Sequence, residues 1–309
     1  ASTGLGALTL NGGQVNISSD ETLSPAGTIT ANANSAHQTS LIAGGTVALN
    51  GSTSFNVARD TTLASDLTIS SVLTDGTSTS SLVKTGAGTL TLAGNNTYTG
   101  TTSINAGTLR VSTNANLGDT TTNSSIVLNG GTLATTATLT TARAITVGNS
   151  GGTIQNATGT TFTTSGALTV ASAGTLTLSG GGTFALGADQ TLAGSLLLGG
   201  STIDLHGFTL SAGTLTLTGD SIIDFGTDAS TLNLTSLNLN GFHLTIQNWV
   251  EGADYFTAQN WTGATYDTTG ASPMNQVTFT GWTADQTRWS SFGNRVTPVP
   301  EPTTTGALL

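Results

Sequence analysis

The sequence predicts an all-β protein wound as a parallel β-solenoid. Three features predict it: the composition, a repeat of about 20 residues, and an alternation of apolar and polar residues within each repeat. Only 7% of the 309 residues are charged, about a fifth are Thr, and 41 are Gly. Thr favours strands and Gly favours tight turns, whereas long helices favour residues such as Lys, of which Lys84 is the single example. Because 36% of the residues are hydrophobic, we expect a packed core rather than disorder.

A Gly-Thr-apolar phrase marks the repeat. It begins at Gly27, Gly45, Gly88, Gly107, Gly131, Gly152, Gly174 and Gly213. The steps between successive phrases are 18, 43, 19, 24, 21, 22 and 39 residues, and the two long steps are about twice the short ones. One unit of about 20 residues therefore explains all of the steps, and this is the length of one solenoid coil with two or three short strands.

Within a unit, apolar and polar residues alternate, as in Leu90-Thr91-Leu92 and Leu215-Thr216-Leu217. Alternate side chains of a strand point to opposite faces, so Leu is expected inside the tube and Thr outside it. Coils stacked about 4.8 Å apart would align like residues in ladders. The segment 203–210 matches 237–244 in apolar character, and we interpret the two as copies of one turn that reveal the register of the coils.

The composition changes near residue 245 and divides the chain into three predicted parts. Residues 1–244 are expected to form the solenoid, 245–296 a β capping module, and 297–309 an extended tail. All four tryptophans fall in the second part: Trp249, Trp261, Trp282 and Trp289. Bulky aromatic side chains suit a module that closes the open end of a tube.

The N-terminal end carries no comparable cap in the sequence. Leu5, Leu8 and Leu10 are expected in a first coil without aromatic or charged neighbours to cover it. An uncovered first coil exposes backbone groups that can pair with another chain. We therefore predict that these leucines and the four tryptophans mark two ends that assemble head to tail.

The segment from Leu82 to Gly100 reads LVKTGAGTLTLAGNNTYTG and continues to Leu109, and LNGGTL follows at Leu128. It resembles the autotransporter-associated β-strand repeat. The resemblance implies a single-chain, right-handed parallel β-helix that is secreted by a Gram-negative bacterium and displayed at its surface or in its matrix. It implies no enzymatic activity.

The C-terminal segment Pro298 to Thr303 resembles a second motif, the PEP-CTERM sorting signal of secreted proteins from bacteria that make exopolysaccharide, with Pro300, Glu301 and Pro302 as its core. The aromatic segment from Leu244 onward resembles the module that often precedes that signal. In the family a hydrophobic helix and an Arg-rich tail follow, and here the sequence ends at Leu309. We expect Ala1 to be a mature end left after signal-peptide cleavage.

Charge and cysteine content exclude several classes of function. The formal net charge is −10, and six scattered Lys and Arg residues cannot form a phosphate-binding patch, so nucleic acid is not expected as a partner. There is no Cys, hence no disulfide framework or thiolate metal site. No apolar run reaches the length of about 18 residues that a membrane span needs.

Candidate chemical residues are few. Asp204 and Asp224 are 20 residues apart and could stack on adjacent coils, where a Ca²⁺ ion would relieve their repulsion. We prefer to interpret them as ordinary outward-facing polar residues and expect no metal site. Arg59, Arg110 and Arg143 are isolated in the sequence, and no cofactor motif or catalytic set of residues is present. We therefore expect neither a cofactor nor an enzyme.

The sequence favours an extracellular structural protein of the bacterial surface or biofilm matrix that assembles head to tail into filaments. Neutral ladders of Thr, Ser and Asn suit such a scaffold, and a head-to-tail contact propagates into a fibre. The alternative is a monomeric surface adhesin that binds exopolysaccharide through its tryptophans. A polysaccharide lyase or hydrolase is disfavoured because the chain hardly supplies the converging acids and bases.

Overall fold

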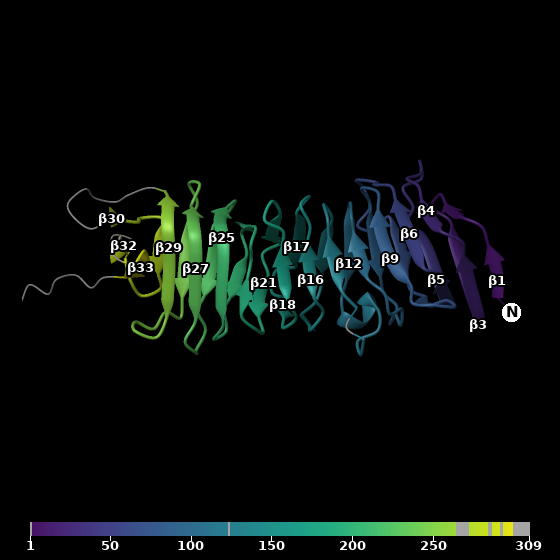
Figure 1. The fold of residues 1–309 in the computed structure, drawn as a ribbon. Helices are drawn as coiled ribbons and strands as arrows, with labels where there is room; N and C mark the ends of the chain where they lie inside the picture. Colours follow the sequence, from purple (N-terminus) through teal and green to yellow (C-terminus); the bar gives the residue numbers. More distant parts are fainter. Residues whose placement is uncertain (1, 123, 264–271, 284–285, 291–292, 299–309) are drawn as a thin grey trace, which may run out of the picture.

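The computed structural model describes residues 2–122, 124–263, 272–283, 286–290 and 293–298 (Figure 1). It confirms the predicted all-β fold: a parallel β-solenoid of about eleven coils, with the strands stacked side by side along one elongated body. Helical structure in the described chain is limited to short 3₁₀ turns such as η1 (Asn114–Leu117). The handedness of the coil stays a prediction of the resemblance.

The coils build three rows of stacked strands. The first row contains β3 (Gln14–Pro25), β5 (Ser40–Leu49), β7 (Leu67–Ile69), β10 (Thr89–Leu92), β12 (Thr108–Val111), β14 (Thr132–Thr135), β17 (Gly152–Asn156), β20 (Thr175–Ser179), β23 (Ser195–Gly199), β25 (Thr209–Leu217), β27 (Thr231–Asn238) and β29 (Tyr255–Thr262). The second row contains β2 (Leu8–Leu10), β4 (Thr28–Ala31), β6 (Ser52–Val57), β9 (Ser81–Thr85), β11 (Thr102–Ile104), β13 (Ile126–Leu128), β16 (Ile145–Val147) and β19 (Leu168–Val170). The third row contains β15 (Leu139–Thr141), β18 (Thr161–Thr164), β21 (Thr183–Leu186), β24 (Thr202–Asp204), β26 (Ser221–Asp224), β28 (Leu244–Gln247) and β31 (Val277–Phe279). Three strands lie beside these rows: β1 (Ser2–Leu5) pairs with β3, β8 (Val72–Asp75) with β5, and β22 (Gln190–Thr191) with β25.

The first row shows why a unit of about 20 residues suffices. Leu90, Leu109, Leu133 and Ile154 are direct partners on successive strands, 19, 24 and 21 residues apart. All four side chains are fully buried. The preceding residues of three of these strands, Thr108, Thr132 and Thr153, align at half-buried positions on the outside of the coil. The predicted separation of Leu inside and Thr outside is confirmed.

The two matched segments 203–210 and 237–244 correct the predicted register. Ile203 lies in the third row, in β24, whereas Leu237 lies in the first row, in β27. Both segments contain the same tight turn, with positive φ at His206 (50°) and Gly207 (84°) and nearly the same angles at their counterparts in the second turn. They are therefore copies of one local turn at two different corners, and the prediction that they occupy equivalent places in the coil was wrong.

The two ends of the rod differ. Within the described residues β1 pairs with β3 alone and β2 with β4 alone, so each leaves its other edge free. At the opposite end the strands turn antiparallel: β33 (Arg295–Pro298) pairs with β29 and with β32 (Thr287–Ser290), which pairs with β30 (Ser272–Pro273). No helix in the described part of the chain has the length and apolar character needed to cross a membrane.

Candidate functional site

The repeat signature around Lys84 is part of the interior of the solenoid. The Lys84 side chain is fully buried, and its Nζ donates hydrogen bonds to the carbonyl oxygens of Thr85 (2.7 Å), Gly86 (2.7 Å) and Ala106 (3.2 Å). Burial lowers the pKa of Lys84 from 10.5 to about 8. This ammonium group joins two successive coils and is closed off from any substrate.

Two other signature residues form buried hydrogen bonds, Asn96 between coils and Tyr98 within its own coil. The Asn96 amide accepts a hydrogen bond from the Leu73 backbone N–H (2.8 Å) and donates one to the Asn116 carbonyl oxygen (2.5 Å). The Tyr98 hydroxyl lies 2.7 Å from the Thr102 hydroxyl, and burial raises the pKa of Tyr98 to about 12. The polar side chains of the repeat therefore satisfy backbone groups of neighbouring coils and a hydroxyl group of the same coil.

The glycines of the signature permit the close stacking. A Cβ atom on Gly94 or Gly100 would lie 2.3 Å from the backbone carbonyl oxygen of the coil below, that of Ser71 or Ser80 respectively. Such a contact is far shorter than van der Waals distance, so a larger residue would push the coils apart. Sequence analysis singled out this motif correctly as a repeat, and its residues have structural roles.

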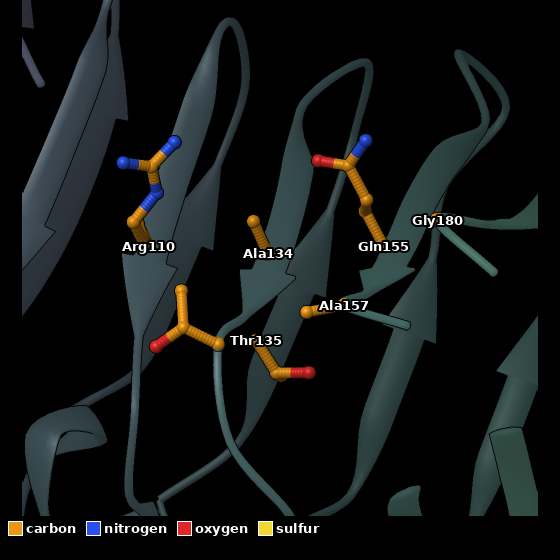
Figure 2. Close-up of a pocket in the computed structure, with 7 residues that line it drawn as sticks. Arg110, Ala134, Thr135, Gln155, Ala157 and Gly180 are labelled. Atoms are coloured by element: carbon orange, nitrogen blue, oxygen red, sulfur yellow. The ribbon is translucent and has the colours of Figure 1, made fainter. Parts of the chain in front are cut away.

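A shallow hollow lies on the outer face of the first row (Figure 2). Arg110, Ala134 and Gln155 are direct neighbours on β12, β14 and β17, and the two long side chains rise on either side of Ala134. The hollow has a volume of about 250 Å³, and its lining contains no acidic residue. Neither a hydrogen bond nor an ion pair engages the Arg110 guanidinium within the described structure.

Sequence reasoning missed this hollow because Arg110 is isolated in the sequence. The residues near Arg110 and Gln155 in the same outward ladder are small: Thr68, Thr91, Ala134, Ser179 and Gly199. The signal for the hollow was the placement of two long side chains, Arg110 and Gln155, on either side of the small residue Ala134. Reading that signal required the register that pairs Arg110 with a residue 24 positions later.

A larger hollow of about 520 Å³ lies over β3, β5 and β8. Its one charged residue is Asp75, which already accepts hydrogen bonds from the Ser80 backbone N–H and from the backbone N–H and hydroxyl of Thr99. The remaining lining residues supply hydroxyl, amide, methyl and backbone groups. This second hollow therefore offers no unused charge to a ligand.

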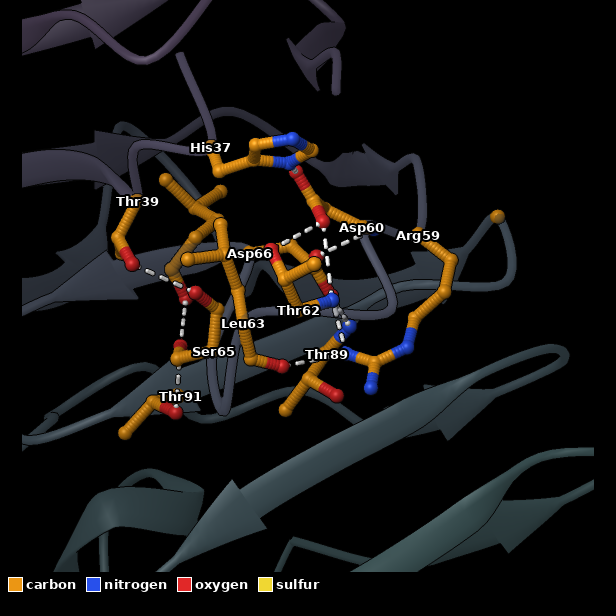
Figure 3. A network of polar contacts seen from close by, with 12 residues as sticks. His37, Thr39, Arg59, Asp60, Thr62, Leu63, Ser65, Asp66, Thr89 and Thr91 are labelled. Carbon is orange, nitrogen blue, oxygen red and sulfur yellow. Dashed lines mark hydrogen bonds and ion pairs between the residues drawn. The ribbon is translucent and has the colours of Figure 1, made fainter. Parts of the chain in front are cut away.

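A polar network surrounds the loop 58–66 (Figure 3). Asp66 is buried and accepts hydrogen bonds from the backbone N–H groups of Asp60 (2.7 Å) and Thr89 (2.6 Å) and from the Arg59 guanidinium (3.1 Å). The His37 ring lies 2.7 Å from the Asp60 carboxylate. Hydrogen bonds from Thr62, with His37 contributing less, lower the pKa of Asp60 to about 2. The network fixes a loop to its coil.

The predicted stacking of Asp204 on Asp224 is present, since the two residues are direct partners on β24 and β26. Asp224 already accepts hydrogen bonds from the Gly226 backbone N–H and the Asn248 amide. Burial and the neighbouring Asp224 carboxylate raise the pKa of Asp204. Across the residues that the structure describes, no group of three or more His, Cys, Asp or Glu side chains is arranged to hold a metal ion.

The four predicted capping tryptophans, Trp249, Trp261, Trp282 and Trp289, are partly buried and pack against the core. The Trp249 ring meets Phe225 and Phe279 edge to face, each at 5.0 Å between ring centroids. The Trp289 indole N–H donates to the Ala258 carbonyl oxygen at 2.7 Å. These indoles are packed into the end of the rod, which limits the ring surface left for stacking on a sugar.

The remaining predicted residues lie at the ends. Leu10 is buried and Leu8 half-buried against the core. Leu5 belongs to β1, but its side chain lies outside the described residues. The predicted sorting signal, Pro300, Glu301 and Pro302, also lies outside the described residues.

Comparison with known proteins places the repeat in a recognised family. A model described as passenger-associated-transport-repeat matches residues 82–111, which span β9 to β12. A segment of 128 residues, 41% of the chain, is 38% identical to the protein named adhesin BmaC autotransporter of Brucella suis biovar 1 (strain 1330). The match covers 4% of that much longer protein. No solved structure matches the chain. The chain is therefore a β-solenoid in which residues 82–111 match the passenger-associated-transport-repeat model.

Proposed function

We propose that the chain is a non-enzymatic, adhesive β-solenoid displayed at the surface of a Gram-negative bacterium or in its matrix. One observation carries the proposal: the passenger-associated repeat at 82–111 lies in the solenoid, and part of the chain resembles a protein named as an autotransporter adhesin. In this proposal the outer faces of the solenoid are the surfaces that contact other cells or materials.

The distribution of polar groups supports a non-enzymatic role. Lys84, Asp66 and Arg143 are buried, and each is hydrogen-bonded to backbone groups. The outside instead carries ladders of neutral hydroxyls such as Thr108, Thr132 and Thr153. General acid–base chemistry needs titratable side chains that converge on a reacting group, whereas hydroxyl ladders suit weak hydrogen bonding over an extended surface.

Surface display is tested on cells that produce the protein naturally. We expect gold-labelled antibodies against the solenoid to bind intact cells, and we expect cells lacking the gene to attach less to polysaccharide-coated surfaces than the parent. Labelling that appears only after cell lysis would overturn the surface location. Equal attachment by both strains, with the surface labelling retained, would overturn the adhesive role.

A second candidate function is head-to-tail assembly into filaments of a surface layer or biofilm matrix. The free edges of β1 and β2 favour it, because an unpaired parallel edge accepts another strand. In this proposal residues 245–296 form the end module that meets the first coil of the next copy, and the tail 297–309 extends onto that neighbour. A preceding coil of a longer chain would occupy the same edge.

Negative-stain electron microscopy of the naturally released protein distinguishes these cases. Head-to-tail assembly predicts uniform fibres that disappear when residues 1–12 or 297–309 are deleted, while the β-sheet circular dichroism is retained. Isolated rods in the parent protein would contradict assembly and leave the monomeric adhesin. Export through a cleaved signal peptide and a Pro300–Glu301–Pro302 sorting signal belongs to the same proposal, and mass spectrometry of the released chain would test it.

A further inference from the structure

We propose that the hollow between Arg110 and Gln155 binds a carboxylate-bearing sugar, a single uronic acid residue. This inference deepens the adhesive role proposed above and rests on it for its biological meaning. The earlier alternative placed sugar binding on the tryptophans at the end of the rod. The hollow lies instead on the outer face of β12, β14 and β17, among the central coils.

Arg110 gives the hollow a positive charge that no other residue of the described structure uses. The chain has six Lys and Arg residues. Lys84 and Arg143 are buried and donate hydrogen bonds to backbone carbonyl oxygens. Arg59 forms an ion pair with Asp66, and Arg295 lies 3.9 Å from Glu251. Arg288 donates a hydrogen bond to a backbone carbonyl oxygen. Arg110 is half-exposed, and its guanidinium has no partner in the described structure. It is the free cationic group of the coils on a chain whose formal net charge is −10.

The hollow has a floor and two walls around that charge. Ala134 forms the floor of the hollow and is 6% exposed, and Gln155 is the exposed wall opposite Arg110 (Figure 2). The Arg110 and Gln155 rungs are two coil spacings apart, about 10 Å. Gly180 borders the far side, where a Cβ atom would lie 2.9 Å from the Gln155 Cγ atom. The space suits one sugar ring lying flat on the sheet.

The chemistry of the walls determines which ligand fits. A guanidinium binds a carboxylate through two parallel hydrogen bonds, and a glutamine amide both donates to and accepts from hydroxyl groups. The lining also supplies the hydroxyl of the exposed residue Thr136. A ligand with one carboxylate and several hydroxyls matches this set. The acidic remainder of the surface repels long polyanions, so we infer a single acidic residue within an otherwise neutral glycan.

Ligand-observed saturation-transfer NMR on the purified chain tests the inference with four probes: glucuronate, its methyl ester, glucose and acetate. We expect glucuronate to bind and the other three to bind at least about tenfold more weakly, because they lack either the charge or the hydroxyls. Arg110→Gln should weaken glucuronate binding about tenfold or more. Ala134→Leu should abolish it by filling the floor, and an outward leucine is tolerated elsewhere in this row at Leu197.

Arg295→Gln is the matched control, because it removes the same charge at the end of the rod, where Arg295 lies over Tyr255. It should bind glucuronate like the parent, and circular dichroism should show all three variants folded. Unchanged binding by Arg110→Gln or Ala134→Leu, or no binding of glucuronate by the folded parent, would overturn the inference. Equal binding of acetate and glucuronate would mean that Arg110 binds a carboxylate alone, and the sugar site would be rejected. These binding measurements use the purified chain and no cells. The sugar-binding inference can therefore be overturned while the surface-labelling experiment supports surface display, and surface display can be overturned while sugar binding is observed.

Discussion

The coils between Ala58 and Arg143 differ from those between Ile145 and Ile246 in what fills their interior. The first region, which we call the stapled region, buries four of the five charged side chains buried in the described structure: Asp60, Asp66, Lys84 and Arg143. In the second, the apolar region, no charged side chain is buried among the described residues, and the interior is mainly Leu, Ile, Val and Phe, with a few neutral polar residues such as Asn156 and Gln190.

The difference follows from the loops. The long segments between strands in the stapled region include 58–66 and 112–125, whose backbone groups leave the regular ladder and need other partners. Arg143 serves the second loop by donating to the carbonyl oxygens of Gly118 (2.8 Å) and Asp119 (2.9 Å) and to the hydroxyl of Ser124. Coils of the apolar region connect through shorter turns, and the buried side chains that bond their backbone groups, such as Asn156 and Gln190, are neutral. Charged residues inside this solenoid therefore mark irregular backbone.

The largest expected effect comes from Arg143. We expect Arg143→Met to lower the free energy of unfolding by about 3–5 kcal/mol, because several buried carbonyls would lose their donors. Arg143→Lys should still cost about 2 kcal/mol, since one ammonium cannot reach all the acceptors. Urea denaturation gives the total, and hydrogen exchange should show faster opening of residues 112–125. A variant as stable as the parent would mean that water replaces the guanidinium.

Phe184 tests the apolar region. Its ring stacks on Phe162 at 5.9 Å between centroids, and both side chains are buried. Phe184→Ala should lower the free energy of unfolding by about 3 kcal/mol through the cavity that it leaves. Phe184→Leu should cost less than about 1.5 kcal/mol, because the coil can repack around another apolar side chain.

Together the two conservative variants sharpen the comparison. A buried charged side chain that bonds several loop carbonyls should lose stability even on a conservative substitution. An apolar position in the interior ladder should tolerate one. If Phe184→Leu cost as much as Arg143→Lys in the same urea titration, the two regions would not differ in their tolerance, and the comparison would lose its basis.

Much of the fold could be predicted from the sequence because it depends on local patterns. Period-two alternation and the spacing of Gly-Thr phrases are visible along the chain, and both were confirmed in the stacked Leu and Thr ladders. The corner at which a turn sits could not be predicted. The turns at His206-Gly207 and Asn240-Gly241 have the same local chemistry, and only long-range strand pairing decides which rows they connect.

The candidate site was harder to predict for a related physical reason. Arg110 and Gln155 are 45 residues apart and acquire their relation only through two register steps, each set by the length of a coil. The buried roles of Lys84 and Arg143 were also hidden, because most of their partners are backbone carbonyl oxygens. Every residue carries such an oxygen, so the sequence holds no signal for the pairing.

Lys84 gives a smaller effect with a pH signature. The pKa of Lys84 is about 8 in the folded chain, where the side chain is buried, and 10.5 when the side chain is exposed to water. Between these values the unfolded chain binds more protons than the folded one, so stability should rise with pH by an amount on the order of 2 kcal/mol. Lys84→Met should lower stability at pH 7 by about 1–3 kcal/mol, because three carbonyls lose their donor, and the rise with pH should disappear.

Urea titrations of parent and Lys84→Met from pH 7 to pH 10 measure this difference. The range ends there because the raised pKa of Tyr98, about 12, makes stability fall at higher pH as the unfolded tyrosine ionises first. Both proteins carry Tyr98, so the difference between them isolates Lys84. Parallel pH profiles for the two would show that the buried ammonium stays charged, held by its carbonyl acceptors.

Asp204 should give the smallest effect and tests whether charge is tolerated on the outside of the apolar region. Because its pKa is raised in the folded chain, the native state binds more protons near that pKa, and stability falls as pH rises through it. Asp204→Asn removes the repulsion from Asp224 and should stabilise the protein at pH 7 by less than about 1 kcal/mol, since the pair is partly exposed. The gain should vanish at low pH, where Asp204 is itself neutral.

Asp228→Asn, the same charge change at an exposed neighbour, should leave stability unchanged. Asp204→Asn could instead be less stable than the parent only when Ca²⁺ is added. That result would mean that the stacked Asp204 and Asp224 carboxylates bind a cation in solution, and that these charges serve to bind it.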